Sequence, residues 1–306
     1  MSFERPQRVS VIDPIAPTIE RVRLMLFKPF DLSKWFTVGF CAWLAYLGQG
    51  GGSPSFNYRA GLHHNAPDLP AVREALLAHL PWVIIGAAVL IPIFVIVGLI
   101  LCWLRSRGKF MFIHCIAGNK AEVAVPWKKF AGQGNSLFLF KIIFGLIAIV
   151  AIGLSLAIAI VAAFAINAAG LNAAAVSGLV VAILAVITAA LLAVLIVKFT
   201  DDFVVPIMFL HTAGCLAGWR EFLAVIACNK ARFALYILFQ IVISLAIIFI
   251  IATVCLAGCC CCCASVLLFV PYVGTVILLP IIVFKRAYSL FYLRQFGTIF
   301  DVFQPA

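Results

Sequence analysis

Five consecutive cysteines, Cys259 to Cys263, with a sixth at Cys255, form the densest group of reactive side chains in the sequence. Thiolates can bind metal, form disulfides or carry out redox chemistry. Adjacent cysteines are poor disulfide partners, because a bridge needs Cα atoms about 4.4 to 6.8 Å apart with suitable Cβ directions. Zinc sites use separated pairs, and no second pair lies nearby. We expect apolar packing, with one disulfide or a metal or redox centre as alternatives.

A second candidate for metal chemistry is His63 and His64, followed by Asp68. These residues lie in a polar stretch, where adjacent histidines are usually solvated, so we predict no metal site here. The sequence also lacks the zinc-protease helix motif, the phosphate-binding lysine loop and the nucleophile-elbow motif. We therefore expect no catalytic residues and no cofactor.

The composition indicates a membrane protein. Hydrophobic residues make up 65% of the chain and charged residues 11%, and the mean hydropathy is +1.19, whereas soluble domains are about half apolar and a quarter charged. A membrane-spanning helix needs about 20 mostly apolar residues. Five stretches satisfy this requirement: Leu80–Leu104, Leu137–Ile166, Ala173–Val197, Phe233–Leu256 and Ala264–Phe284.

The shorter apolar segment Trp35–Leu47 is either a sixth span or a re-entrant segment. The basic residues decide between these two interpretations. If it spans, 20 of the 22 Lys and Arg residues fall on one side, and only Arg59 and Arg73 lie on the other. Cytoplasmic loops are enriched in Lys and Arg. We therefore predict an all-α bundle of six transmembrane helices with both termini in the cytoplasm.

Serine chemistry inside the membrane is a further possibility, because Ser155 follows Gly153 in a pattern that loosely resembles an intramembrane serine protease. Ser155 lies deep in a predicted span. The two candidate bases, His114 and His211, lie at the cytoplasmic ends of other spans. A serine nucleophile needs its base within hydrogen-bonding distance, so this arrangement argues against an intramembrane enzyme.

Similar segments follow the second, fourth and sixth predicted spans. Their sequences are MFIHCIAG (Met111–Gly118), MFLHTAG (Met208–Gly214) and FYLRQFG (Phe291–Gly297), which align His114, His211 and Arg294. The first two are followed by PWKKF and GWREF, in which Trp127 and Trp219 are expected to anchor the chain at the membrane interface. Such internal similarity predicts a repeat architecture.

These patterns divide the chain into an N-terminal segment (1–34), a transmembrane domain (35–297) with an external loop (49–79), and a tail (298–306). The domain contains three helical-hairpin units of about 14–118, 119–214 and 215–297, each preceded by an interfacial segment. In the first unit, apolar residues recur at helical spacing between Asp13 and Lys34. This pattern predicts a helix in the headgroup plane, with a core-packing helix as the alternative.

Charged residues lie at equivalent positions before the aligned segments. Arg105, Asp202 and Lys285 each precede their aligned position by nine residues. If the hairpins pack around a common axis, Asp202 can pair with Arg105 or Lys285. The local alternative is a pair with Lys198, four residues away on the same helix. We treat these four residues as a candidate structural charge cluster.

Four stretches resemble a family of uncharacterised bacterial six-helix membrane proteins. They are DFVVPIM (Asp202–Met208), WREF (Trp219–Phe222), PYVGTVILLP (Pro271–Pro280) and FGTIFDVF (Phe296–Phe303). More distantly, the chain is similar to the membrane region that accompanies some glycerophosphodiester phosphodiesterases. The resemblance implies a multi-pass protein of the bacterial inner membrane, and it supplies no catalytic residues.

The sequence therefore predicts a structural or accessory membrane protein without catalysis of its own, acting as a scaffold or binding lipids or partners. The alternative is a transporter or channel subunit that works as an oligomer, because mid-span polar residues are few. The formal net charge of +11 indicates anionic lipids at the cytoplasmic face rather than nucleic acid. A homo-oligomer or another membrane protein is the expected protein partner.

Overall fold

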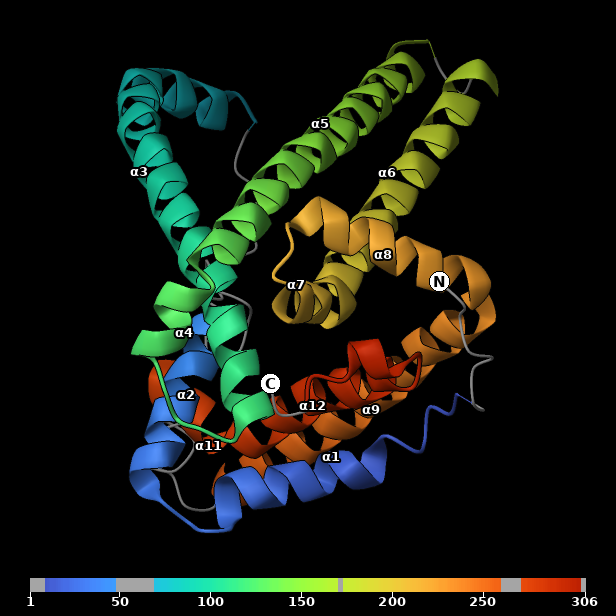
Figure 1. Cartoon of the computed structure of the whole chain (residues 1–306). Coiled ribbons are helices and arrows are strands. Elements are labelled where there is room, and N and C mark those ends of the chain that lie inside the picture. The colour runs from blue at the N-terminus through green and yellow to red at the C-terminus, as the bar shows by residue number, and fades with distance from the viewer. Residues whose placement is uncertain (1–8, 48–68, 170–172, 260–270, 304–306) are drawn as a thin grey trace.

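The structure is a computed structural model that describes residues 9–47, 69–169, 173–259 and 271–303. These residues are helical throughout, with short connections and no strand among them (Figure 1). Four long helices dominate: α3 (Leu69–Gly118), α5 (Ala131–Ala169), α6 (Ala173–Phe199) and α9 (Lys230–Cys259). Their sequences are rich in Ala, Leu and Ile and nearly free of charge over long runs, so they form continuous apolar helices.

Four segments are long and apolar enough to cross a membrane: Ile84–Gly118, Ala131–Ile166, Val176–His211 and Lys230–Thr253. They correspond to the second to fifth predicted spans. At most 17% of the most apolar stretch of each is buried within the protein. Apolar helices with so little protein cover are suited to lipid, so the structure supports a membrane protein.

The six-span count stays a prediction. Helix α2 (Leu32–Tyr46) has only 15 residues, which is about 22 Å at 1.5 Å per residue, less than the roughly 30 Å hydrocarbon thickness. The described part of the sixth predicted span is divided between α11 (Pro271–Ile277) and α12 (Leu279–Arg294). Helices α2 and α11 pack against each other, since the Trp35 indole N–H donates to the Val276 carbonyl at 2.9 Å.

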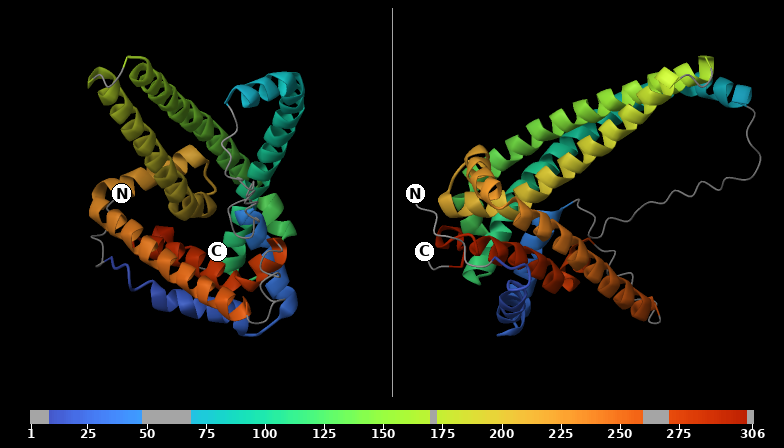
Figure 2. Two further views of the ribbon diagram at one scale, coloured as in Figure 1. Left: turned by 180° about the vertical axis from the view of Figure 1, so that it is seen from behind. Right: turned by 90° about the vertical axis from the view of Figure 1, so that its right-hand side faces the viewer.

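The long helices project from a common base. Helices α3, α5 and α6 extend to the same side of it, whereas α9 diverges from them (Figure 2). The base contains α2, α12 and the shorter helices α1 (Ile15–Val22), α4 (Ala124–Lys129), α7 (Val205–His211) and α8 (Cys215–Cys228). Helices α5 and α6 pack as one hairpin, and α2 packs along α3.

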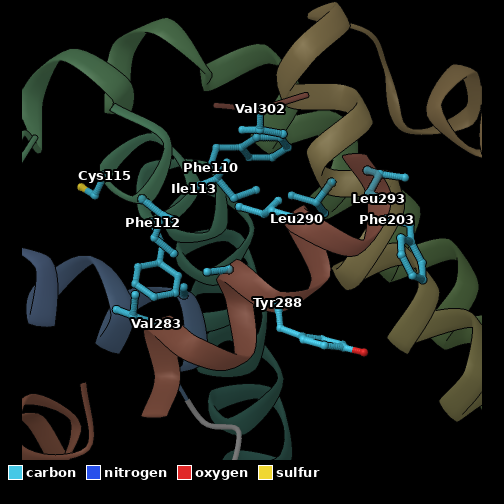
Figure 3. Close-up of a cluster of buried hydrophobic side chains, with 14 of the residues drawn as sticks. Phe110, Phe112, Ile113, Cys115, Phe203, Val283, Tyr288, Leu290, Leu293 and Val302 are labelled. Carbon is cyan, nitrogen blue, oxygen red and sulfur yellow. The ribbon is translucent and has the colours of Figure 1, made fainter. Parts of the chain in front are cut away.

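The apolar core lies in the base and is organised around α12. In Figure 3, Phe112 of α3 points towards Val283, and Phe110 lies close to Val302. These side chains are at most 5% exposed. Tyr288 is also buried, and its hydroxyl donates to the Val11 carbonyl at 2.8 Å. The core thus joins α12 to α3 and to the beginning of the described chain.

The two ends of the described chain meet in the base. The Ser10 N–H donates to Gln295 Oε1 at 2.8 Å, and Gln295 Nε2 donates to the Ser10 carbonyl at 3.0 Å. This two-way pairing joins residues 285 positions apart in sequence. The beginning of the described chain therefore lies next to the C-terminal end of α12.

The predicted N-terminal helix is present but shorter than expected. Helix α1 continues as a π-helix, η1 (Arg23–Phe27), and the chain then becomes extended at Lys28. The expected continuation to Lys34 is wrong, because Asp31 begins a new helix by accepting the Ser33 N–H at 2.8 Å. The location of α1 in the headgroup plane of a membrane stays a prediction.

Arg21 of α1 caps the C-terminal end of α3. Its Nε donates to the Ile116 carbonyl at 2.9 Å, and its side chain also donates to the Ala117 carbonyl at 2.6 Å. These carbonyls have no partner within the helix, so a cation here satisfies them and complements the helix dipole. Burial lowers the pKa of Arg21.

The three aligned positions of the repeated segments each contact a carboxylate that follows them in sequence. The contacts are His114 Nε2 to Glu122 Oε2 at 3.7 Å, His211 Nδ1 to Glu221 Oε2 at 2.9 Å, and Arg294 Nε to Asp301 Oδ2 at 3.0 Å. Asn119 and Thr212, which follow α3 and α7, both have left-handed φ values, 53° and 49°. The chain therefore turns in a similar way after these two helices.

The two predicted anchor tryptophans pack against neighbouring helices. Trp127 of α4 meets Trp103 edge-on, with ring centroids 5.8 Å apart, and the Arg107 guanidinium lies over its ring at 5.1 Å. Trp219 of α8 packs against Phe140 at 6.1 Å. Both are partly buried, and their interfacial role stays a prediction.

Cys260–Cys263, His63, His64 and Asp68 lie outside the described residues, as does most of the predicted external loop; Cys259 ends α9, with its side chain undescribed. Within the described ranges, no group of three or more His, Cys, Asp or Glu residues is placed to hold a metal ion. Two buried cysteines do meet there, with Cys41 and Cys115 Sγ atoms 3.7 Å apart.

Candidate anion-binding cavity

A cavity of about 560 Å³ lies where α2, α3, α5, α6 and α12 come together. This volume is within the usual range for small-molecule sites, about 300 to 1,000 Å³. Its charged lining consists of Arg105, Lys109, Lys141, Lys198, Asp201, Asp202, Lys285 and Arg286. Six cationic groups thus face two carboxylates, which leaves an excess of positive charge in a partly enclosed space.

The structure brings together all four residues of the predicted charge cluster, and of the two pairings considered for Asp202 it shows the local one rather than the one between repeats. Asp202 Oδ2 lies 2.7 Å from Lys198 Nζ, one turn earlier on the same helical segment. It also accepts a hydrogen bond from the buried Tyr236 hydroxyl at 3.0 Å. The local alternative prevails because a spacing of four residues places the two side chains on one helix face.

Asp201, which sequence reasoning missed, makes the contacts between hairpins. Its Oδ1 forms ion pairs with Lys109 of α3 and, at 3.3 Å, with Lys141 of α5. Its main-chain carbonyl accepts a hydrogen bond from Arg286 of α12. One residue therefore joins three other helices at the base of the cavity.

A π-helical turn, η2 (Thr200–Val204), presents these two carboxylates. The Val205 N–H donates to the Thr200 carbonyl, a spacing of five residues. The next donor in this pattern would be Pro206, which has no N–H. The Asp201 carbonyl is therefore left for Arg286. Such turns are rare and frequently occur at functional sites, and Pro206 was the sequence signal for this one.

Three cations of the cavity form no ion pair with the described carboxylates. Among the described residues, Arg105 and Lys285 have no hydrogen bond or ion pair, and Arg286 NH2 is buried without a partner although the residue is only 5% exposed. Burial lowers the pKa of Lys285, the nearby Lys198 ammonium lowers it further, and the Asp202 carboxylate opposes this shift only in part. A buried polar cationic group without a partner is costly, so Arg286 NH2 favours binding of an anion, and the partly buried Arg105 and Lys285 add positive charge beside it.

The rest of the cavity wall is mostly apolar and continues along the long apolar helices α5 and α6. Phe140, Phe144 and Ala148 of α5 lie on one side, and Val194 and Val197 of α6 on the other. The arrangement therefore combines cationic groups at the base with an apolar wall along the α5–α6 hairpin. It matches the chemistry of an amphipathic anion.

The search for related sequences places the chain in a family. A model described as a family of unknown function, DUF7544, matches residues 9–270. The chain belongs to the DUF7544 family. The matched region contains five of the six candidate spans predicted from sequence and, of the charged cavity residues, all except Lys285 and Arg286.

Searches of curated proteins and of solved structures found no match. The expected similarity to the membrane region of glycerophosphodiester phosphodiesterases is not supported by the DUF7544 match. No function can therefore be transferred to this DUF7544 member, and the cavity is the starting point for a functional proposal.

Proposed function

We propose that this DUF7544 member is a non-catalytic, multi-pass membrane protein that binds an anionic lipid in the cavity between its hairpins. Its role would be structural or accessory, with the bound lipid connecting it to the bilayer or to a membrane protein partner. Arg286 is the observation that carries this proposal. Its NH2 group is buried beside the cavity without a partner, and phosphate oxygens are suitable acceptors for a guanidinium.

The predicted topology belongs to this proposal. Six spans in a bacterial inner membrane, with both termini cytoplasmic, would place the basic cavity near the cytoplasmic headgroups, where anionic lipids attract Lys and Arg. The pairing of Ser10 with Gln295 supports termini on one side. The similar contacts of His114, His211 and Arg294 support three repeated units.

The topology predicts opposite locations for Tyr58 and Pro305. An epitope tag inserted after Tyr58 should be accessible to antibody in spheroplasts, because this segment carries little positive charge. A tag at Pro305 should become accessible only after the membrane is permeabilised. Accessibility of both tags on the same side would contradict the six-span topology.

Lipid binding predicts that the double variant Arg105→Gln, Lys285→Gln loses bound anionic lipid. Neither residue has a partner within the described chain, so folding should be largely unaffected. Each charge-assisted hydrogen bond contributes about 1.5 to 3 kcal/mol, so we expect lipid retained after detergent purification to fall by about tenfold or more. Native mass spectrometry of the purified protein measures this quantity.

The matched control is Arg220→Gln with Lys128→Gln, which removes two exposed cations away from the cavity. This variant should retain lipid at the wild-type level. Equal lipid loss in both double variants would indicate non-specific surface attraction and would contradict a cavity site. Protein-dependent movement of lipid or solute across proteoliposomes would instead favour the transporter alternative.

A further inference from the structure

The two carboxylates that line the cavity influence which lipid headgroup it can accept. Asp201 Oδ1 pairs with Lys109 and Lys141, and Asp202 Oδ2 pairs with Lys198. Asp202 also accepts the Tyr236 hydroxyl hydrogen bond. Both acidic groups of the lining are thus already engaged by cations of the protein itself.

A headgroup ammonium would therefore meet only carboxylates whose charge is already compensated by lysines of the protein. It would also lie among cations without acidic partners, Arg105, Lys285 and Arg286, and like charges repel strongly where water is partly excluded. A phosphate faces the opposite situation, because the same three groups can donate to its oxygens. The phosphate and the ammonium of a zwitterionic lipid consequently experience opposing forces in this cavity.

We infer that the cavity discriminates between phospholipids by the rest of the headgroup: it accepts a phosphate that carries a polyol or no substituent and rejects one that carries an ammonium. This inference rests on the proposed function, since it requires that lipid occupies the cavity. It goes further by assigning the selectivity to the pairing of Asp201 and Asp202 with lysines rather than to the cations alone.

The apolar wall indicates that the phosphate belongs to a lipid rather than to a free anion. Phe140, Phe144 and Val197 extend the lining from the charged groups along α5 and α6. Burial of acyl methylene groups there contributes affinity that inorganic phosphate lacks. Inorganic phosphate is therefore expected to compete poorly with a phospholipid.

The experiment uses delipidated full-length protein in mild detergent. It is offered equimolar phosphatidylglycerol and phosphatidylethanolamine with identical acyl chains, and native mass spectrometry gives the ratio of bound lipids. We expect phosphatidylglycerol to be enriched about tenfold or more, because a difference of one charge-assisted contact between the two lipids corresponds to at least this ratio. Addition of millimolar inorganic phosphate should leave the bound lipid in place. A wild-type ratio near one, or displacement by phosphate, overturns the inference.

Lys198→Gln tests the cause of the selectivity. This variant leaves the Asp202 carboxylate without its cation and available to an ammonium. The enrichment should fall towards one while total lipid binding is maintained. Lys128→Gln, which removes an exposed lysine outside the cavity, should keep the wild-type ratio. An unchanged ratio in Lys198→Gln would show that the carboxylates do not set the selectivity.

The two proposals can fail separately. If wild-type protein binds both lipids equally, and Arg105→Gln with Lys285→Gln lowers both, phospholipid occupies the cavity but the selection by headgroup is refuted. If that double variant changes the binding of neither lipid, lipid does not occupy the cavity and the proposed function itself is refuted.

Discussion

Asp201→Asn is expected to lower the free energy of unfolding by about 3 to 5 kcal/mol, the usual cost of leaving a buried charge without its counter-ion. The substitution removes the acidic partner of Lys109, whose side chain is 6% exposed, and of Lys141. It preserves the size of the side chain, so the loss is electrostatic. Reversible unfolding in mixed micelles, followed by tryptophan fluorescence, measures the change.

A second substitution separates the charge effect from general damage. Lys109→Met in the Asp201→Asn background removes the unpaired ammonium and should recover a large part of the stability. The control is Glu20→Gln, which breaks the pair with Arg23, whose side chains are both more than half exposed. Exposed pairs contribute about 0 to 1 kcal/mol. If Asp201→Asn costs no more than this control, the central role of Asp201 is refuted.

Gly108→Ala is expected to destabilise the packing of α2 against α3. A Cβ atom at Gly108 would lie 2.7 Å from the main-chain carbonyl carbon of Leu44 and 2.8 Å from the Ala45 nitrogen. Main-chain atoms cannot move aside as a flexible side chain can, so the two helices must separate. Overpacking of this kind costs about 1 to 3 kcal/mol, occasionally more, and the same unfolding assay reports it.

The matched control lies on the same helix. A Cβ atom at Gly98 meets nothing within 4 Å, so Gly98→Ala should be neutral or stabilising by about 0.5 to 1 kcal/mol, the helix preference of alanine over glycine. Opposite signs for the two substitutions would confirm close helix contact at Gly108. Equal small effects would mean that α2 and α3 are further apart at this point.

The sequence predicted the long apolar helices well, because their length and lack of charge are properties of each segment alone. It failed where tertiary contacts decide the outcome. The N-terminal helix ends at Phe27 instead of continuing to Lys34, and the last predicted span is interrupted at Leu278. The base core around Tyr288 joins segments far apart in sequence, and no local pattern specifies such contacts.

The candidate site was predicted in part. Counting along the repeats brought Arg105, Asp202 and Lys285 to one depth, and helical spacing added Lys198 as the local partner of Asp202. The structure places all four around one cavity. The choice between Asp201 and Asp202 as the residue that contacts other hairpins depends on helix rotation, and the π-turn alters that rotation. Regular helical spacing could not reveal it, although Pro206 marked the position.

The small buried fraction of the projecting helices has a mechanical consequence. Above the base, α3 and the α5–α6 hairpin diverge (Figure 1), and in a bilayer lipid would fill the space between them. The lateral pressure and thickness of such a bilayer would then act on the angle between α3 and the hairpin. Residues of α3 and of the α5–α6 hairpin line the cavity at the base. A change in membrane tension would therefore alter the width of the cavity.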